Sequence, residues 1–472
     1  MSRIPIPSPA FALWLTLTGL VCGGGCSEDP APPSASAEPP APGPAVPPAV
    51  KPAAAPEPGS GKPEDRPAPA GLVVGDWPCF RGPEHNSLSR ETGLLASWGE
   101  KGPPLLWEVA SGPTYAAPTV VGERLILFHR LDGDNGDDRE VVDCLDAATG
   151  RALWRHSYPT KYVDKYGYNG GPRASPVVEA GRVYTWGAEG WFHCLELDTG
   201  KVVWDRRLNA EYDVEQNFFG VGASPLIEGD RILLNVGGPK GAGVMALDKK
   251  TGKTVWKATD DGASYCTAAV ADTPAGRLAV FLTRAGVVAC DPKTGAVKIS
   301  YPFRSRTFES VNAADPVIVG DRLFVSSAYR TGGVLLKITA DPDVTEIWKN
   351  DSMRNHWATC LVADGCLYGF DGRHEDETQL RCVELATGKV LWSKRGLGRG
   401  SMIRADGRYW ILSEDGRLIL AEMSPKEYVE KAASAELLRA PCWIAPVLSR
   451  GRLYVRNEHT LLCLDVRDPA KR

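Results

Sequence analysis

Acids, histidines and cysteines are the side chains of this chain best suited to chemistry, and their spacing matches few known sites. The densest group of oxygen ligands, 132–138 (DGDNGDD), lacks the terminal Glu of an EF-hand calcium loop. The seven histidines show no paired metal-ligand spacing. No Cys-x-x-Cys-His, Gly-x-Ser-x-Gly or P-loop motif occurs. The sequence therefore predicts no metal site and no catalytic residue, and 132–138 is interpreted as a solvated hairpin loop.

A further set of acids recurs at a fixed spacing instead of forming one cluster. Each acid stands three residues before a Thr-Gly pair: Asp146, Glu196, Asp248, Asp291 and Glu384. In four of these places the pair begins a Thr-Gly-x-x-x-Trp motif, and Ile299 replaces the Trp in the fifth. Because acids before such a pair can hydrogen-bond the backbone of a tight turn, we interpret them as turn residues rather than calcium ligands or a general base.

The turn acids belong to a repeating unit that residues 171–204 contain in full. This stretch predicts four short strands, at 175–178, 183–186, 191–195 and 201–204, separated by turns. A glycine between the first two strands recurs in eight places: Gly122, Gly181, Gly229, Gly276, Gly320, Gly365, Gly407 and Gly451. A period of about 40 to 50 residues with four strands is typical of a propeller blade rather than of a helical solenoid.

The two ends of the repeat region are incomplete in complementary ways. Residues 104–109 (PLLWEV) have the pattern of a fourth strand without the preceding three, whereas the last unit, 445–465, supplies three strands without a fourth. Joining the two ends closes the ring and removes exposed sheet edges. The sequence therefore predicts an all-β, eight-bladed propeller of four-stranded antiparallel blades, closed by this N-terminal strand.

The cysteines of the repeat region occupy regular positions. Four lie two residues before an acid in the third strand of different blades: Cys144, Cys194, Cys382 and Cys463. We expect these four to be small apolar residues inside the sheets, kept apart by the blade spacing. Cys360 and Cys366 flank the first hairpin of the sixth unit. Buried free thiols are the interpretation we favour there, with a disulfide as the alternative in an oxidising compartment.

The first 70 residues have the composition of a leader and a tether. Residues 1–26 carry Arg3, an apolar run and small residues ending at Cys26, which predicts a secretion signal of lipoprotein type with Cys26 as the lipid anchor. Secretion without a lipid is the alternative. Residues 27–70 are rich in Pro and Ala and predict a disordered linker, so 71–472 would form the propeller. The formal charge of the chain is −4, and the 54 basic and 58 acidic residues are well mixed along the sequence. This mixing argues against a nucleic-acid partner.

The repeats at 174–204 and 223–256 resemble the PQQ-like (pyrroloquinoline-quinone-like) β-propeller repeat family. The phrases that carry the resemblance are ASPVVEAGRVYTWGAEGWFHCLELDTGKVVW and ASPLIEGDRILLNVGG…VMALDKKTGKTVW, and it covers roughly residues 76–467. Members include quinoprotein alcohol dehydrogenases and the propeller lipoprotein of the outer-membrane β-barrel assembly machinery. The resemblance implies that tryptophans dock adjacent blades: Trp107, Trp154, Trp204, Trp256, Trp348 and Trp392.

The dehydrogenases of this family hold the quinone with a calcium ion in the central funnel, and many cover it with a ring formed by two adjacent cysteines. No Cys-Cys pair occurs here. We therefore expect no cofactor, and PQQ with calcium belongs only to a dehydrogenase alternative.

A ligand or partner of a propeller is expected at the funnel mouth, where the loops entering the first strands converge with those joining the second and third. These loops are aromatic and polar here, and such side chains can anchor a partner. The candidate binding residues are Tyr166, Tyr168, Asn169, Arg173, Asn217, Tyr265, Asn312, Asn355 and His356. The alternative is that they pack the funnel and bond its inner strand edges.

The sequence thus predicts an exported, lipid-anchored propeller at the periplasmic face of the bacterial envelope. It would act as a non-catalytic binding or assembly scaffold that presents its loops to an envelope protein or polymer. A quinone-dependent alcohol dehydrogenase is the alternative, and a carbohydrate-binding module is a weaker one.

Overall fold

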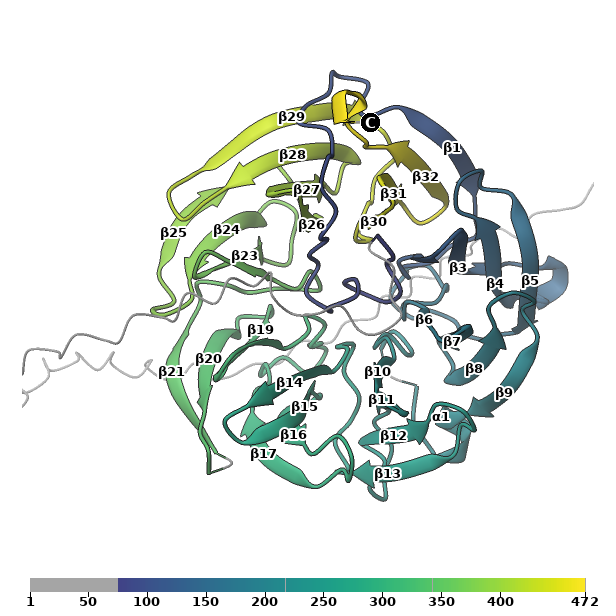
Figure 1. The fold of residues 1–472 in the computed structure, drawn as a ribbon. Coiled ribbons are helices and arrows are strands. Elements are labelled where there is room, and N and C mark those ends of the chain that lie inside the picture. The colour runs from purple at the N-terminus through teal and green to yellow at the C-terminus, as the bar shows by residue number, and fades with distance from the viewer. Residues whose placement is uncertain (1–74, 217, 342, 472) are drawn as a thin grey trace, which may run out of the picture. The chain divides into compact units, whose positions relative to one another are not determined.

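The computed structural model describes residues 75–216, 218–341 and 343–471. The predictions for 1–26, for 27–70, for Cys26 as a lipid anchor and for Asn217 lie outside these residues. The described chain forms eight four-stranded antiparallel sheets set around a central axis, as Figure 1 shows, so the eight-bladed all-β propeller is confirmed. Within the described residues, no helix is long and apolar enough to cross a membrane.

Each blade runs from a short inner strand to an outer strand, and blades 1 to 4 follow one another along the chain. Blade 1 contains β2 (Thr119–Val121), β3 (Arg124–Leu131), β4 (Arg139–Asp146) and β5 (Ala152–Pro159). Blade 2 contains β6 (Val177–Glu179), β7 (Arg182–Trp186), β8 (Trp191–Glu196) and β9 (Val202–Arg207). Blade 3 contains β10 (Leu226–Glu228), β11 (Arg231–Asn235), β12 (Val244–Asp248) and β13 (Thr254–Ala258). Blade 4 contains β14 (Ala269–Thr273), β15 (Gly276–Leu282), β16 (Gly286–Cys290) and β17 (Val297–Pro302).

Blades 5 to 8 continue in the same order, and the only α-helix among the described residues is α1 (Leu208–Glu211), after blade 2. Blade 5 contains β18 (Val317–Val319), β19 (Arg322–Ser327), β20 (Gly332–Ile338) and β21 (Val344–Asn350). Blade 6 contains β22 (Leu361–Ala363), β23 (Cys366–Asp371), β24 (Gln379–Glu384) and β25 (Val390–Lys394). Blade 7 contains β26 (Ser401–Ala405), β27 (Arg408–Leu412), β28 (Arg417–Met423) and β29 (Tyr428–Glu436). Blade 8 contains β30 (Val447–Ser449), β31 (Arg452–Arg456), β32 (Thr460–Asp465) and β1 (Leu105–Ala110).

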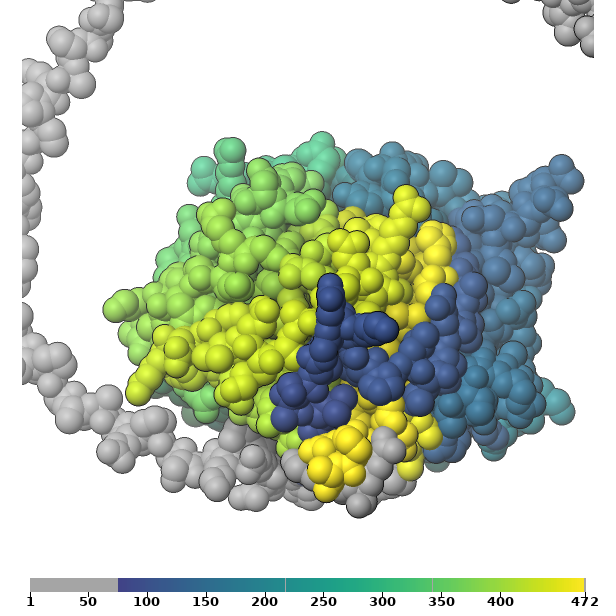
Figure 2. Space-filling view, turned by 90° about the horizontal axis from the view of Figure 1, so that it is seen from above, coloured from purple at the N-terminus to yellow at the C-terminus, as the bar shows by residue number. Residues whose placement is uncertain are grey.

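The ring closes where the sequence predicts. The outer strand of blade 8 is β1, which pairs antiparallel with β32 and sets Trp107 opposite Cys463. In Figure 2 the purple residues of this early segment lie against the yellow C-terminal blade. The two ends of the repeat region therefore share one sheet, which closes the ring between its last and first blades.

Regular turns explain why the same fold recurs eight times. All eight glycines between first and second strands have positive φ, from 57° at Gly122 to 94° at Gly276, a region that side-chain-bearing residues avoid. The predicted turn acids also act as turn residues, since the Asp146 carboxylate accepts hydrogen bonds from the N–H groups of Ala148 and Thr149. These bonds lower the pKa of Asp146, and the Thr149 hydroxyl contributes most.

The apolar core lies in layers between neighbouring blades rather than in one central mass. One layer joins Tyr184 and Cys194 of blade 2 to Ile232 and Met245 of blade 3. Each cysteine among the described residues is a buried free thiol, Cys360 and Cys366 included. The four third-strand cysteines lie in β4, β8, β24 and β32, as the spacing predicts.

Tryptophan side chains join six of the eight pairs of neighbouring blades. In all six predicted positions the indole N–H donates to a backbone carbonyl of the following blade, over 2.8 to 3.3 Å. Trp107 makes this bond to Ala147, so blade 8 is tied to blade 1 in the same way as the other five pairs. The rings also cover the Thr-Gly turns, because a Cβ added at Gly200 would lie 2.5 Å from the Trp154 ring.

A second set of inter-blade bonds encircles the channel just before the inner strands. The N–H of Ala117 donates to Ser175, that of Ser175 to Ser224, and that of Ser224 to Thr267. The chain of bonds continues from Thr267 to Asp315 and from Asp315 to Thr359. Five consecutive pairs of neighbouring blades, from blades 1 and 2 to blades 5 and 6, are thus each joined by one polar side chain. That side chain always stands two residues before the inner strand of its blade.

Residues 76–95, which we call the plug segment, cross the centre of the ring in Figure 1. Trp77 exchanges backbone hydrogen bonds with Val120 of blade 1, and Ser89 donates to Arg404 of blade 7. Asp76 and Glu91 accept from the N–H groups of turns between first and second strands, at Gly122 and Gly451. The plug segment therefore covers the face that carries these turns and leaves the opposite mouth open.

Candidate functional site

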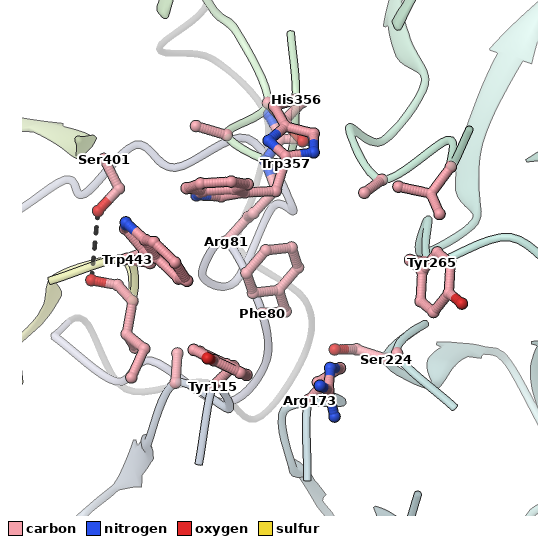
Figure 3. A pocket seen from close by; sticks show the side chains of 18 of the residues that line it. Phe80, Arg81, Tyr115, Arg173, Ser224, Tyr265, His356, Trp357, Ser401 and Trp443 are labelled. Atoms are coloured by element: carbon pink, nitrogen blue, oxygen red, sulfur yellow. Dashed lines mark hydrogen bonds between the residues drawn. The ribbon is translucent and has the colours of Figure 1, made fainter. Parts of the chain in front are cut away.

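A cavity of about 230 Å³ lies at the open mouth of the channel. It is lined from every blade, mainly by the loops that lead into the inner strands: Tyr115, Arg173, Ser224, Tyr265, Val311, Trp357, Ser401 and Trp443. Phe80 and Arg81 of the plug segment close it from the other side. In Figure 3, Tyr115, Trp357 and Trp443 lie on one side of the space and Arg173 and Tyr265 on the other, with Phe80 between them.

The walls of the cavity are mostly aromatic. The Tyr115 and Trp443 rings stack with centroids 5.8 Å apart, and Trp357 lies 5.0 Å from Trp443. Across the cavity, the Phe219 and Tyr265 rings are 5.7 Å apart. Interlocked rings of this kind lose little side-chain entropy when they bind, so the cavity is already formed for an apolar or planar group.

Arg81 ties the plug segment to the channel. Its guanidinium donates to the Cys360 carbonyl at 3.2 Å and lies 3.7 Å from the Asp315 carboxylate. Both side chains are more than nine-tenths buried. Burial raises the pKa of Asp315 to about 6, although Arg81 and the Thr267 N–H favour the charged form. Since arginine stays protonated, the two groups form an ion pair at neutral pH.

Two further arginines face the cavity. Arg173 donates to the buried Asp164 carboxylate at 2.8 Å and lies 5.2 Å over the Tyr115 ring. Arg373 lies 4.4 Å over the ring of Tyr329. Guanidinium groups stacked on aromatic faces keep outward N–H donors for an anion. Arg81 and Arg173 are each paired with a buried carboxylate, so of the three arginines only Arg373 has no ion pair within the described residues. The cavity is therefore aromatic, with one uncompensated arginine at its wall.

His356 is the one imidazole at the cavity among the described residues, and it is held neutral. Its Nε2 lies 3.1 Å from the Tyr329 hydroxyl. Burial, together with the charges of Arg373 and Arg399, lowers the pKa of His356 to about 3. A histidine that is neutral throughout the physiological range serves here as a hydrogen-bonding group, and its pKa is far from that of an effective general base.

The cavity does not fit the calcium-quinone centre that the sequence resemblance raises. None of the residues that line it is Asp or Glu. Calcium takes six to eight oxygen ligands, carboxylates among them, and a carboxylate base would also be needed to take the alcohol proton. The lining could hold a planar anion between its rings and arginines, but it supplies neither the calcium ligands nor the base.

Four of the predicted binding residues line the cavity: Tyr168, Arg173, Tyr265 and His356. Tyr166 lies on the outer rim, where 48% of its surface is exposed and its ring is 5.4 Å from Phe219. The loops entering the first strands thus converge at the mouth and bring these five residues together.

The remaining described candidates brace loops instead. Asn312 and Asn355 are buried, and each side-chain amide donates to a backbone carbonyl at 2.9 Å. Asn169 donates to the Glu458 carboxylate at 2.6 Å. None of the three lines the cavity, because their amides satisfy neighbouring backbone and side-chain acceptors.

The sequence prediction did not include several lining residues, among them Phe80, Arg81, Tyr115, Trp357 and Trp443. The repeat itself contains a sequence signal for three of these residues, Tyr115, Trp357 and Trp443. The residue four positions before the inner strand lines the cavity in seven blades: Tyr115, Arg173, Gly222, Tyr265, Ala313, Trp357 and Trp443. Aligning the blades at this offset would have found Tyr115, Trp357 and Trp443, whereas no repeat signal marks the plug residues.

Comparison with known proteins places the chain in a family. A family model described as outer membrane protein assembly factor BamB matches residues 138–394. The chain is 27% identical over 309 residues to the outer membrane protein assembly factor BamB of Burkholderia pseudomallei, an alignment that covers 62% of this chain and 72% of that protein.

Two solved structures show the same fold. The crystal structure of BamB from Moraxella catarrhalis superposes with a TM-score of 0.54 at 15% identity, covering 77% of this chain and 98% of that one. Quinohemoprotein alcohol dehydrogenase from Comamonas testosteroni superposes with a TM-score of 0.59 at 13% identity, covering 84% of this chain and 82% of that one. Since the family model spans more than half of the sequence, the chain belongs to the PQQ-like propeller family described as outer membrane protein assembly factor BamB.

Proposed function

We propose that this chain is a non-catalytic binding scaffold of the bacterial cell envelope that takes part in outer-membrane protein assembly, as the names of its BamB relatives say of them. The observation that carries the proposal is the chemistry of the mouth. Its cavity presents aromatic rings and arginines without a lining carboxylate. Such a surface is suited to gripping a partner and lacks the groups that quinone-dependent alcohol oxidation needs.

The partner would dock on the rim of the mouth beside the cavity. A groove there is lined by Tyr166, Phe218, Arg284 and Phe308, from the loops of blades 2 to 5. Phe308 is 69% exposed, and its ring packs edge-on against Phe218 at 6.0 Å. Arg284 lies over both phenylalanine rings. Exposed aromatic residues combined with arginine are typical of the residues that dominate protein interfaces.

This arrangement favours a protein partner over a sugar. A carbohydrate-binding module would offer flat, accessible aromatic faces. On this rim the Phe218 and Phe308 planes are 89° apart, and Arg284 covers a face of each ring. The exposed Phe308 ring is instead suited to insert between side chains of a protein surface.

The leader and tether support the cellular location. A lipid on Cys26 and the 27–70 linker would hold the ring at the periplasmic face of a membrane while leaving its mouth within reach of assembly proteins. We propose that the lipid-anchored form is the working form.

Complementation of a deletion strain tests the rim. A double variant, Tyr166→Ser with Phe308→Ser, is expected to restore β-barrel protein levels in the outer membrane less well than the unaltered chain, because it loses the exposed aromatic anchors. The control is Val202→Ser with Val297→Ser, which alters outer-strand residues that are 44% and 43% exposed. Equal complementation by the rim variant and the control would contradict the proposed docking surface.

A separate measurement tests the enzyme alternative. Calorimetric titration of the purified chain with pyrroloquinoline quinone, in calcium and again in chelator, is expected to give no calcium-dependent binding. Saturable one-to-one binding that needs calcium would overturn the non-catalytic assignment.

A further inference from the structure

A cleft rich in positive charge lies beside the mouth, outside the aromatic cavity. It has a volume of about 650 Å³ and is formed by residues 302–307, which leave blade 4, together with the turn between β19 and β20 and one residue of β21. Its charged lining consists of Arg304, Arg306, Arg330 and Lys349, and no Asp or Glu lines it. In a chain whose charges are otherwise well mixed, this is a local excess of four positive charges.

None of the four cations forms an ion pair within the described part of the chain, since none lies within 4.0 Å of a carboxylate oxygen there. Lys349 donates to the Tyr301 hydroxyl at 3.4 Å and lies over the ring of that tyrosine. The same hydroxyl donates to the Glu346 carboxylate, so Lys349 has an acidic residue nearby, whereas the three arginines have no hydrogen-bonded acid among the described residues. Four like charges that converge on one cleft repel each other, and an anion placed between them would remove that repulsion.

Hydrogen bonds order the backbone on which the arginines stand. Ser305 is buried, its hydroxyl donates to the Tyr329 carbonyl at 2.9 Å, and it accepts from the Thr307 N–H at 3.1 Å. The first bond joins the 302–307 loop to the β19–β20 turn, and the second closes a turn within the loop. Together they fix the backbone at Ser305, whose neighbours Arg304 and Arg306 have exposed side chains. The cleft is therefore a built feature, in which two segments from different blades are bonded to each other.

The β19–β20 turn is itself strained. Tyr329 and Arg330 have φ of 57° and 59°, a conformation that hairpin turns normally give to Asn and Gly. Each costs about 1 kcal/mol for a residue with a side chain. The turn sends Tyr329 to His356 in the aromatic cavity and carries Arg330 to the cleft.

We propose that this cleft binds a phosphate group. Guanidinium forks match phosphate oxygens with paired hydrogen bonds, and three arginines with one lysine suit a group that carries two negative charges. Thr307 and Thr331 also line the cleft. The phosphate belongs either to a free ion or to the headgroup of an anionic lipid, two sources that the two probes below distinguish. The proposal does not rest on the partner proposed for the rim.

The test uses the full chain and two probes, pyrophosphate and phospholipid vesicles. The variant replaces Arg304, Arg306 and Arg330 by Gln. The control replaces three exposed lysines in turns at the opposite face, Lys201, Lys253 and Lys389, by Gln. Calorimetry measures pyrophosphate binding. Sedimentation compares vesicles that contain phosphatidylglycerol with vesicles of phosphatidylcholine alone, so that a lipid on Cys26 contributes equally to both.

The chain and the control are expected to bind at least one probe, and the variant to bind it about tenfold or more weakly. Pyrophosphate binding would identify a free-ion site, and binding only to phosphatidylglycerol vesicles would identify a lipid headgroup site. Failure of the unaltered chain to bind either probe, or equal binding by the variant and the control, would overturn the proposal. Neither binding measurement depends on β-barrel assembly. Failure of the phosphate proposal can therefore be told apart from failure of the proposed assembly function.

Discussion

Replacing Arg81 by Met tests whether a buried ion pair holds the plug segment in the channel. The change keeps most of the side-chain volume but leaves the Asp315 carboxylate without its cation in a site that is 6% exposed. Removing one partner of a buried pair typically costs about 3 to 5 kcal/mol of unfolding free energy, because the remaining charge is uncompensated. We expect a loss in this range at pH 7.5.

The cost should depend on pH, because burial raises the pKa of Asp315 in the folded state from its ordinary value of 3.8 to about 6. A raised carboxyl pKa means that the folded state binds the proton more tightly. The raised pKa contributes about 3 kcal/mol to the unfolding free energy. This contribution is fully present below about pH 4 and is lost as the pH rises through 6. Without Arg81 the pKa of Asp315 should rise further.

At pH 5 Asp315 is mostly protonated in the unaltered chain, so the ion pair is already weakened and its removal should cost less than at pH 7.5. Urea unfolding at both pH values measures the difference, and Arg151→Met, a change in an exposed turn, is the control. An equal loss of unfolding free energy at pH 5 and pH 7.5 would refute the ion-pair argument.

Two further predictions concern the turns and the mouth. Gly200→Ala should lower the unfolding free energy by about 2 to 4 kcal/mol in urea unfolding, because its φ is +69° and the new Cβ would lie 2.5 Å from the Trp154 ring. Gly181→Ala, with φ of +73° and open space, should cost only about 1 kcal/mol, and equal losses would contradict the packing argument. His356, with a pKa of about 3, should show no imidazole protonation above pH 5 in an NMR titration. A midpoint near pH 6 would contradict its burial.

Most of the fold was predictable because each blade repeats the same local chemistry. The glycine at position 122 and its seven equivalents mark the first turn, and the Thr-Gly-x-x-x-Trp motif marks the last turn and the outer strand. The half-units at 104–109 and 445–465 could be joined because a propeller leaves no other place for an unpaired strand. These signals are local, so they can be read without knowing which residues meet in space.

The site was only partly predictable because its residues do not repeat in type. The wall position four residues before the inner strand holds Tyr, Arg, Gly, Ala or Trp, so only its offset is regular. Phe80 and Arg81 come from a segment outside the repeats. The partners of Arg81, Asp315 and Cys360, lie more than 200 residues away in the sequence. The cleft of Arg304, Arg306 and Arg330 depends on two loops that meet only in the folded ring.

The plug segment also sets an order of events for a newly made chain. It is made before any of the blades, yet it hydrogen-bonds Arg404 of blade 7 and Val466 beyond β32, which are made near the end. Its docking must therefore wait until the final blades have formed, and the same holds for β1. Residues 76–110 would remain accessible to proteases until the whole ring has assembled. Resistance of this segment to proteolysis would therefore indicate a fully folded molecule, and its cleavage would indicate an incompletely folded one.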